Sequence, residues 1–250
     1  MIERKHRKLI TYFLSILVFL LIWTLLARSI NAPLILPSVS EVFIKIFEFI
    51  QTKSFWTHFL YTFLRVLLSF FISLIAGTFI GLLCGHSKII KDFLDFPLTF
   101  IRSTPVVAII IVALFWFNSS NIPIFVAILM DLPIVVTAIT EGYSKEDKNL
   151  MYMAKVYKLS HYQVFKYIKL KALKPFFLNS AVSVFGLSWK VVTAGEVISI
   201  PKYGFGSLMQ INQVHLETSS VIAVTLVLVI FSFTIEKLFA YFVSKGLKNG

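Results

Sequence analysis

Charged side chains inside long apolar segments are the residues of this sequence whose types could do chemistry. Lys190 and Asp131 lie near the middle of two such segments, and Arg102 lies about nine residues into a third. Charges at bilayer depth are costly, so they mark functional sites by default. Lys190 and Asp131 share a depth and have opposite signs, which predicts an ion pair inside the protein. Alternatively, Lys190 and Arg102 line a pathway and attract an anion. Glu196 lies near the end of its segment, where headgroups tolerate a charge.

The motifs of nucleotide and hydrolytic chemistry do not occur in the sequence. It contains no G-x-x-x-x-G-K-[ST], no H-E-x-x-H and no G-x-S-x-G. The five histidines are scattered without ligand spacing, and the single cysteine, Cys84, cannot form an intrachain disulfide. We therefore expect no metal site, no bound cofactor and no catalytic residue on this chain.

Composition indicates that lipid surrounds the segments that hold these charges. Apolar residues make up 58% of the 250 positions and charged residues 14%, and the mean hydropathy is +0.85. Soluble domains are roughly one quarter charged. The net charge of +12 could indicate nucleic-acid binding. The basic residues, however, lie in short segments between apolar runs, as membrane topology requires, so nucleic acid is excluded as a partner.

Six apolar segments are long enough to cross roughly 30 Å of hydrocarbon as helices. Long runs without alternation exclude a β-barrel. The predicted fold is an all-α integral membrane protein with a single domain over residues 1–250. The predicted spans are 9–27, 57–85, 93–117, 121–141, 176–199 and 218–242.

The distribution of basic residues predicts the orientation of these spans. With the N-terminus in the cytoplasm, the inner segments hold 17 Lys and Arg residues and the outer segments hold four. Because Lys and Arg accumulate on the cytoplasmic side of membrane proteins, both termini are expected there.

Two further patterns concern helix placement. Residues 38–52 are predicted to form an outer helix, because Ser38 and Glu41 make a capping box and apolar residues follow on one face. This helix lies either on the membrane surface or against the bundle.

The second span carries small residues every four positions, which allow close helix packing, with a hinge as the alternative. These residues are Ser69, Ser73, Gly77, Gly81 and Gly85.

Segment 142–175 is polar, yet its composition is that of a folded loop. Helix-start signals occur at 144–147 and 160–163, with a break at 158–159 between them. Pro175 is expected to begin the fifth span, where it loses no hydrogen bond. Two short helices with apolar and aromatic faces are therefore predicted to project into the cytoplasm. From the residues alone, they either dock another protein or lie on anionic lipid.

Residues 150–160, LMYMAKVYKLS, are followed by Lys174-Pro175. This stretch resembles the EAA loop of binding-protein-dependent ABC importer permeases of the nitrate/sulfonate/taurine group, which carry L-L-E-x-A-x-x-x-G-x-S and then L-P. The matching positions are Ala154, Ser160 and Pro175, whereas Tyr152 replaces the usual glutamate and Lys158 the usual glycine.

Further segments resemble the same family in order and spacing over about residues 34–245. They are Leu36-Pro37-Ser38-Val39-Ser40-Glu41-Val42, Arg65 with the small-residue stripe, Arg102-Ser103-Thr104-Pro105, Ser188-Trp189-Lys190, Gly195-Glu196-Val197, and Pro201-Lys202-Tyr203-Gly204-Phe205-Gly206.

The resemblance implies a six-span permease subunit of the type I ABC importer architecture, located in the bacterial plasma (inner) membrane. Its expected partners are a second permease copy, a cytoplasmic ATPase that binds ATP and Mg, and an extracellular or periplasmic substrate-binding protein. The cargo would be a small solute, with anions such as nitrate, sulfonate or taurine as candidates. The residues expected to dock the ATPase are Tyr152, Met153, Ala154, Tyr157, Lys158, Leu159, Ser160 and Pro175.

Two other classes of function are alternatives to this one. A secondary transporter or channel would need no ATPase and would favour inverted repeats, which the sequence does not show. A membrane enzyme would need clustered acids, histidines or serine motifs near one interface.

Overall fold

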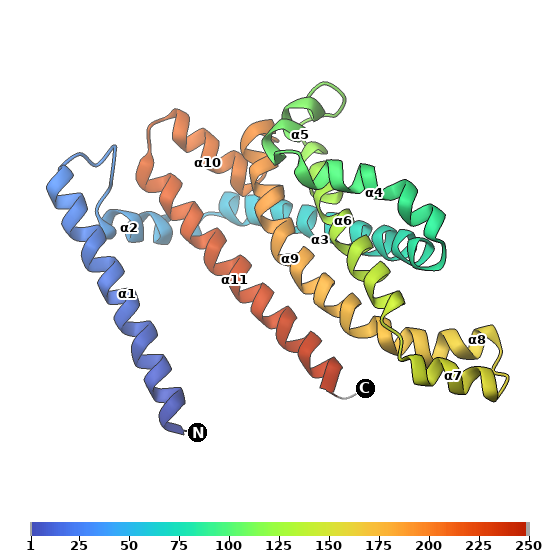
Figure 1. Cartoon of the computed structure of the whole chain (residues 1–250). Coiled ribbons are helices and arrows are strands. Elements are labelled where there is room, and N and C mark those ends of the chain that lie inside the picture. The colour runs from blue at the N-terminus through green and yellow to red at the C-terminus, as the bar shows by residue number, and fades with distance from the viewer. Residues whose placement is uncertain (1, 249–250) are drawn as a thin grey trace.

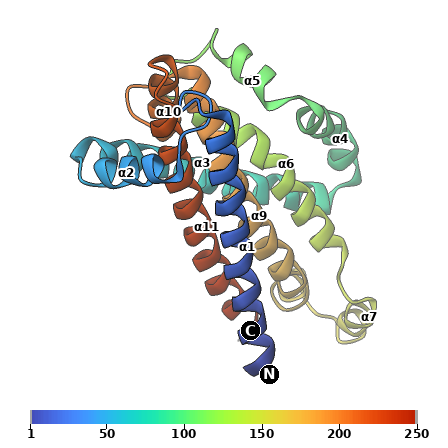
Figure 2. The same ribbon diagram turned by 90° about the vertical axis from the view of Figure 1, so that its left-hand side faces the viewer.

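A computed structural model describes residues 2–248 of the chain, and every regular element in that range is a helix (Figure 1). The helices lie side by side as a bundle, with α7 at the same end as the described start of α1 and end of α11, and α10 at the other end (Figure 2). The helices are α1 (Ile2–Ile30), α2 (Val39–Ile50), α3 (Lys53–His86), α4 (Lys88–Ser103), α5 (Val106–Ala113), α6 (Ile122–Ser144), α7 (Lys148–Val156), α8 (His161–Val164), the π-helical turn η1 (Phe165–Lys169), α9 (Leu170–Ser199), α10 (Phe205–Val214) and α11 (Thr218–Lys248).

Five stretches of helix in the described residues are long and apolar enough to cross a membrane: parts or all of α1, α3, α6 and α11, and the helix from α8 to the end of α9. The third predicted span, 93–117, is instead two helices, α4 and α5, which meet at an angle of 96°. The break occurs at Thr104-Pro105, where Thr104 adopts an extended backbone with ψ 129°. A residue before proline is disfavoured in the α conformation, so the helix ends there.

The fifth span does not begin at Pro175, which corrects that prediction. Pro175 lies inside α9, and α9 continues back through the π-helical turn η1 into α8. A π turn is a local widening that often occurs at functional positions in helices. The second loop helix and the fifth span are therefore one continuous piece of helix.

The stripe of small residues on α3 faces α6. A Cβ atom built at Gly77 would lie 2.6 Å from Cβ of Val135, and one at Gly81 would lie 2.6 Å from Cβ of Ile139. The Thr140 hydroxyl also donates a hydrogen bond to the Gly81 carbonyl at 3.3 Å. The two backbones approach so closely that only glycine fits at these positions. Ser73 donates to the Ile128 carbonyl at 3.5 Å, and Gly85 lies against Tyr143.

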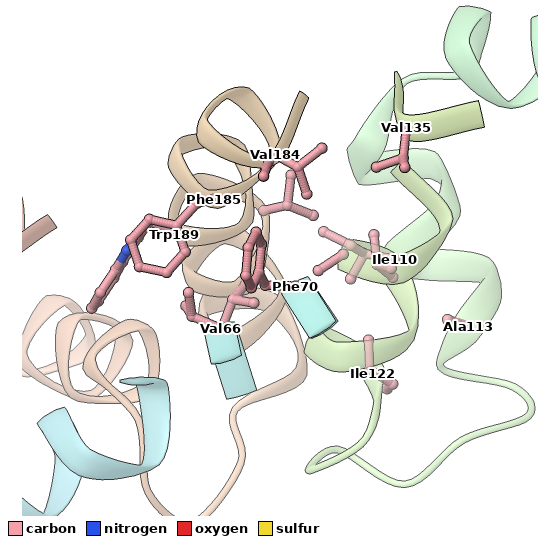
Figure 3. Packing of buried hydrophobic residues seen from close by; sticks show 14 of the residues in the cluster. Val66, Phe70, Ile110, Ala113, Ile122, Val135, Val184, Phe185 and Trp189 are labelled. Atoms are coloured by element: carbon pink, nitrogen blue, oxygen red, sulfur yellow. The ribbon is translucent and has the colours of Figure 1, made fainter. Parts of the chain in front are cut away.

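The main apolar core lies where α3, α5, α6 and α9 meet (Figure 3). Phe70 of α3 packs edge-on against Phe185 of α9, with ring centroids 5.3 Å apart. Val66, Ile110 and Val184 are fully buried in the same cluster. Burial of these side chains fixes the positions of α3, α5 and α9 relative to one another.

Helices α1 and α2 lie at the edge of the bundle. None of the membrane-spanning window of α1 is buried inside the chain, and the Trp23 indole ties it to the Pro37 carbonyl at 3.0 Å. Helix α2 starts with the capping box of Ser38 and Glu41, as the sequence predicts. Its Val42 is buried, while Phe43 and Phe47 are exposed, so α2 packs on the bundle with one face only.

Replacing Gly81 by leucine tests the close packing of α3 on α6. The larger side chain must displace Ile139 or separate the helices, which is expected to cost about 1–3 kcal/mol. The measurement is the thermal unfolding midpoint of the detergent-solubilised chain. Leu68→Phe enlarges a side chain that is 49% exposed on the same helix and should change the midpoint little. Equal midpoints for Gly81→Leu and the unmodified chain would contradict the packing.

Candidate functional site

A buried ion pair joins α3 to the end of α9 that lies farthest from the loop helices. The Arg65 Nη1 atom donates to Oε1 of Glu196 at 2.6 Å, and the two side chains are 7% and 0% exposed. The same Nη1 atom donates to the Tyr203 carbonyl at 2.6 Å. Arg65 therefore links two long helices and the turn that follows α9.

The Glu196 carboxylate has further partners. The Thr62 hydroxyl donates to Oε2 of Glu196 at 2.9 Å, and the Gly206 N–H donates to the same oxygen at 3.0 Å. Thr62 in turn accepts a hydrogen bond from the Phe205 N–H at 2.8 Å. A buried charge is tolerable only when it is paired and hydrogen-bonded, and Glu196 meets both conditions.

Two glycines allow the turn to lie against the carboxylate. A Cβ atom at Gly204 would lie 2.5 Å from the carboxylate carbon of Glu196, and one at Gly206 would lie 2.5 Å from the Thr193 carbonyl oxygen. Gly204 also contacts His58, whose Nδ1 lies 2.9 Å from the Gly204 carbonyl oxygen and 3.0 Å from its nitrogen. Larger residues would therefore push the turn away from α3 and α9.

The placement of Glu196 corrects one expectation. Its position near a helix end suggested contact with headgroups, but the side chain is fully buried and paired with Arg65. The cluster also contains His58 and Thr62, which the sequence did not single out, and Tyr203 and Gly206, which were named only as part of a segment that resembles the family. Three of its members share a face of α3, because His58, Thr62 and Arg65 are spaced by four and three residues. This spacing of polar residues is the sequence pattern that could have predicted the cluster.

The ion pair predicted between Lys190 and Asp131 is wrong. Asp131 is fully buried, and its Oδ2 accepts a hydrogen bond from the Ser188 hydroxyl at 2.6 Å. Lys190 is exposed and forms no ion pair with any residue that the structure describes. Positions 188 and 190 of a helix point about 200° apart, so turning Ser188 toward Asp131 turns Lys190 away.

Lys190 instead lines a cavity of about 480 Å³ between α9, α10 and α11. Glu236 and Trp189 line the same cavity, and the buried Trp189 Nε1 atom has no hydrogen-bond partner. Arg102 is exposed in the last turn of α4 and does not line this cavity. The two cations proposed to line one pathway are therefore not brought together within a single chain.

Helices α7 and α8 project from the end of the bundle that lies opposite α10 (Figure 1). Helix α7 starts after its N-cap Asp147, because Ser144 still belongs to α6. Lys169 ties the loop to α6: its Nζ lies 3.2 Å from Oε2 of Glu146 and 3.7 Å from the centre of the Tyr143 ring. The loop is therefore attached to the bundle by a defined contact.

The end of α7 shows how the loop accommodates Lys158 in place of glycine. Lys158 has a left-handed backbone with φ 53°. The Leu159 N–H bonds the Ala154 carbonyl at 2.9 Å and the Lys158 N–H bonds the Lys155 carbonyl at 3.2 Å, which is a Schellman motif. The turn type usual for glycine is therefore kept, at the backbone cost of a side chain in the left-handed region. Ser160 then starts α8 with the expected capping box.

One face of α7 is apolar, aromatic and exposed. Tyr152 and Tyr157 are both 71% exposed, Val156 is 61% exposed and Met153 is 50% exposed. We call these four residues the α7 face. Ala154 is only 4% exposed and does not belong to this face, and its role in docking stays a prediction. Within the described residues, no group of three or more His, Cys, Asp or Glu could hold a metal ion.

Replacing Glu196 by alanine tests the buried ion pair. The change leaves the Arg65 guanidinium buried without its counter-ion, which is expected to cost about 3–5 kcal/mol of stability. Chemical or thermal unfolding in detergent measures the loss. The matched control is Glu48→Ala, which removes the exposed Lys45–Glu48 pair at 38% and 54% exposure and should cost about 0–1 kcal/mol. Equal losses for the two variants would show that Glu196 is not a stabilising partner.

Known proteins share this chain's sequence pattern. Residues 77–246 match the family described as binding-protein-dependent transport system inner membrane component. The taurine transport system permease protein TauC of Escherichia coli K12 is 25% identical over 223 residues, which cover 86% of this chain and 80% of that protein. The nitrate import permease protein NrtB of Leptolyngbya laminosa is 30% identical over 138 residues, which cover 54% of this chain and 49% of that protein.

Solved structures of ABC transporters share the fold. A chain of the inward-facing MetNI methionine ABC transporter superposes with a TM-score of 0.58 at 15% identity, covering 72% of this chain and 92% of that one. A chain of an amino acid ABC transporter with histidines superposes with a TM-score of 0.58 at 18% identity, covering 76% of this chain and 90% of that one. With the family match extending over more than half of its length, the chain belongs to the binding-protein-dependent transport system inner membrane components.

Proposed function

We propose that this chain is the permease subunit of an ABC importer whose ATP is hydrolysed by a separate subunit that binds to the α7 face. The observation that carries the proposal is this face: four exposed apolar or aromatic residues, on a helix that projects from a membrane bundle. Exposed apolar patches on a projecting element are typical of protein interfaces. ATP and Mg would be bound by the partner, because this sequence has no phosphate-binding loop.

The proposed orientation puts the α7 face in the cytoplasm. Segments at the α7 end hold 17 basic residues and those at the other end hold four, which favours the cytoplasm for the basic end. The described start of α1 and end of α11 belong to the basic end. The turn 200–206 and α10 would then lie at the outer side, where a substrate-binding protein would deliver its cargo.

A second copy of the chain is part of the proposal. Helix α1 is not buried within its own chain, and its Phe13, Leu21 and Leu25 are more than half exposed. Lipid or a neighbouring protein must cover these side chains. A permease dimer would enclose a pathway between two copies, which a single bundle with a packed core does not offer.

The proposed cargo is a small oxyanion or sulfonate. The relatives are described as permeases for taurine, nitrate and aliphatic sulfonates, and each of these solutes carries an anionic oxygen group. Lys190 provides an exposed positive charge at the wall of the cavity between α9, α10 and α11. An unpaired cation in a membrane protein attracts anions strongly because little water screens it.

The overall proposal is tested by reconstitution. The chain is co-expressed with a candidate ATPase and a candidate secreted binding protein, and the complex is purified in detergent and placed in nanodiscs. ATP hydrolysis should rise when the loaded binding protein is added. Anion transport by the chain alone, with no ATPase retained during purification, would favour the secondary transporter or channel instead.

Charge placed on the α7 face should prevent docking of the ATPase. The double variant Tyr152→Glu/Tyr157→Glu puts two carboxylates on the interface, where they must lose their hydration without a partner. The ATPase should no longer co-purify, while the unfolding midpoint of the permease stays unchanged because both side chains are 71% exposed. The control Tyr152→Phe/Tyr157→Phe keeps the rings and should retain the ATPase. Full retention by the glutamate variant would rule out docking on this face.

Removing the charge of Lys190 should slow anion uptake. In the reconstituted importer, Lys190→Met is expected to lower the transport rate at limiting substrate by about tenfold or more, which corresponds to about 1.4 kcal/mol. Lys190→Arg keeps the charge and should retain most of the rate. The unfolding midpoint should be nearly unchanged, since Lys190 is exposed and unpaired among the described residues. Equal rates for the Met and Arg variants would remove Lys190 from the pathway.

A further inference from the structure

A second cavity lies at the α7 end of the bundle, away from the one that Lys190 lines. It measures about 670 Å³ and lies between α3, α6 and the helical segment formed by η1 and the start of α9. Its wall is largely apolar and includes Leu82 of α3, Ile139 of α6 and Phe177 of α9. Three lysines, Lys166, Lys171 and Lys174, also line it. We call this space the lysine-lined cavity.

The charges around this cavity are all positive. No acidic residue belongs to its lining. Glu146 is the acid that pairs with this part of the chain, and its partner is Lys169, which does not line the cavity. Within residues 2–248, none of the three lining lysines forms an ion pair. The cavity therefore presents three uncompensated cations beside an apolar wall.

The apolar wall is shared by three helices, whereas the lysines all come from one segment. Leu82 and Ile139 belong to helices that are long and apolar enough to span a membrane. The lysines belong to the polar segment that joins α6 to the apolar part of α9. Leu82 and Ile139 thus lie about one turn before the ends of α3 and α6, and the lysines lie in the first turns of the helix that continues into the fifth span.

We propose that the lysine-lined cavity binds an anionic phospholipid, with its phosphate at Lys166, Lys171 and Lys174 and an acyl chain against the apolar wall. An amphiphile satisfies both surfaces at once, whereas a soluble anion would leave the apolar wall uncovered. Basic pockets between membrane helices on the cytoplasmic side are suited to such lipids. The assignment to the inner leaflet rests on the orientation in the proposed function, but the binding itself does not.

The occupied cavity would connect the loop to the bundle. The π-helical turn η1 supplies one part of the wall, and α3 and α6 supply the other. A lipid held between them would add contacts between the loop and helices α3 and α6. The position of the α7 face relative to the membrane would therefore depend on anionic lipid.

The test measures lipid binding to the purified permease in neutral detergent by native mass spectrometry. Phosphatidylglycerol and phosphatidylcholine with the same acyl chains are titrated in parallel, and phosphatidylglycerol is expected to bind at least about tenfold more tightly. The variant Lys166→Gln/Lys171→Gln/Lys174→Gln should lose most of this difference. Because no ATPase or substrate takes part, the outcome is independent of whether the permease functions in an ABC importer.

A matched control removes the same charge from the same end of the bundle. Lys88→Gln/Lys91→Gln/Lys145→Gln changes three exposed lysines that do not line the cavity and should keep the preference for phosphatidylglycerol. Equal losses in the two triple variants would show attraction to a basic surface only and would overturn the proposal. Unfolding midpoints of both variants confirm that each is folded.

A separate variant tests the apolar wall. Leu170 lines the cavity and is 52% exposed, so Leu170→Trp should fill space without unfolding the chain or changing its charge. Phosphatidylglycerol binding is expected to fall. Undiminished binding would place the lipid elsewhere. Competition by millimolar glycerol phosphate, which has no acyl chain, would indicate a soluble phosphate site instead and would also overturn the proposal.

Discussion

The buried pair of Arg65 and Glu196 sets the geometry of the outer half of the proposed permease. A carboxylate with no exposed surface is stable there only because a guanidinium, a hydroxyl and a backbone N–H reach it together. The carboxylate comes from α9 and its partners come from α3 and the start of α10, so none of the three elements can shift without breaking the cluster. Gly204 and Gly206 complete the constraint, since a side chain at either position would collide with the groups that hold the turn.

A row of residues spaced three or four apart on α3 carries this constraint along the bundle. Its polar part, from His58 to Arg65, meets α9 and the turn before α10. Its small part, from Ser73 to Gly85, meets α6 at backbone contact distance. The row changes from polar to small residues where its neighbour changes from a turn, whose N–H groups bond to side chains, to a continuous helix. Ion pairing and close packing are therefore consecutive parts of one interface.

Length and hydropathy were enough to predict which segments form spanning helices. They were not enough to predict where a proline interrupts a helix. Pro105 ends a helix because Thr104 takes the extended backbone, whereas Pro175 lies within α9, downstream of the π turn η1. Local rules expect an interruption at both prolines, and only the packing of the whole chain distinguishes them. Helix α10 was missed for a related reason: its ten residues are too few for a span and follow a turn sequence.

In the candidate site, the sequence indicated the depth of each charged residue but not the direction in which its side chain points. Depth in the membrane was estimated well enough to compare Lys190 with Asp131, but depth does not say which way a side chain points around its helix. The partner of Asp131 is Ser188, two residues from Lys190 and about 200° away on the helix surface. Arg65 and Glu196 match in depth and in helical face. Arg65 shares a face of α3 with Thr62, and both side chains reach the Glu196 carboxylate. A pairing between membrane helices must therefore be argued from depth and helical face together. By that criterion Lys190, on the face of α9 turned toward α10 and α11, keeps the charge that the proposed function assigns to attracting the solute, while Glu196 is committed to holding the fold.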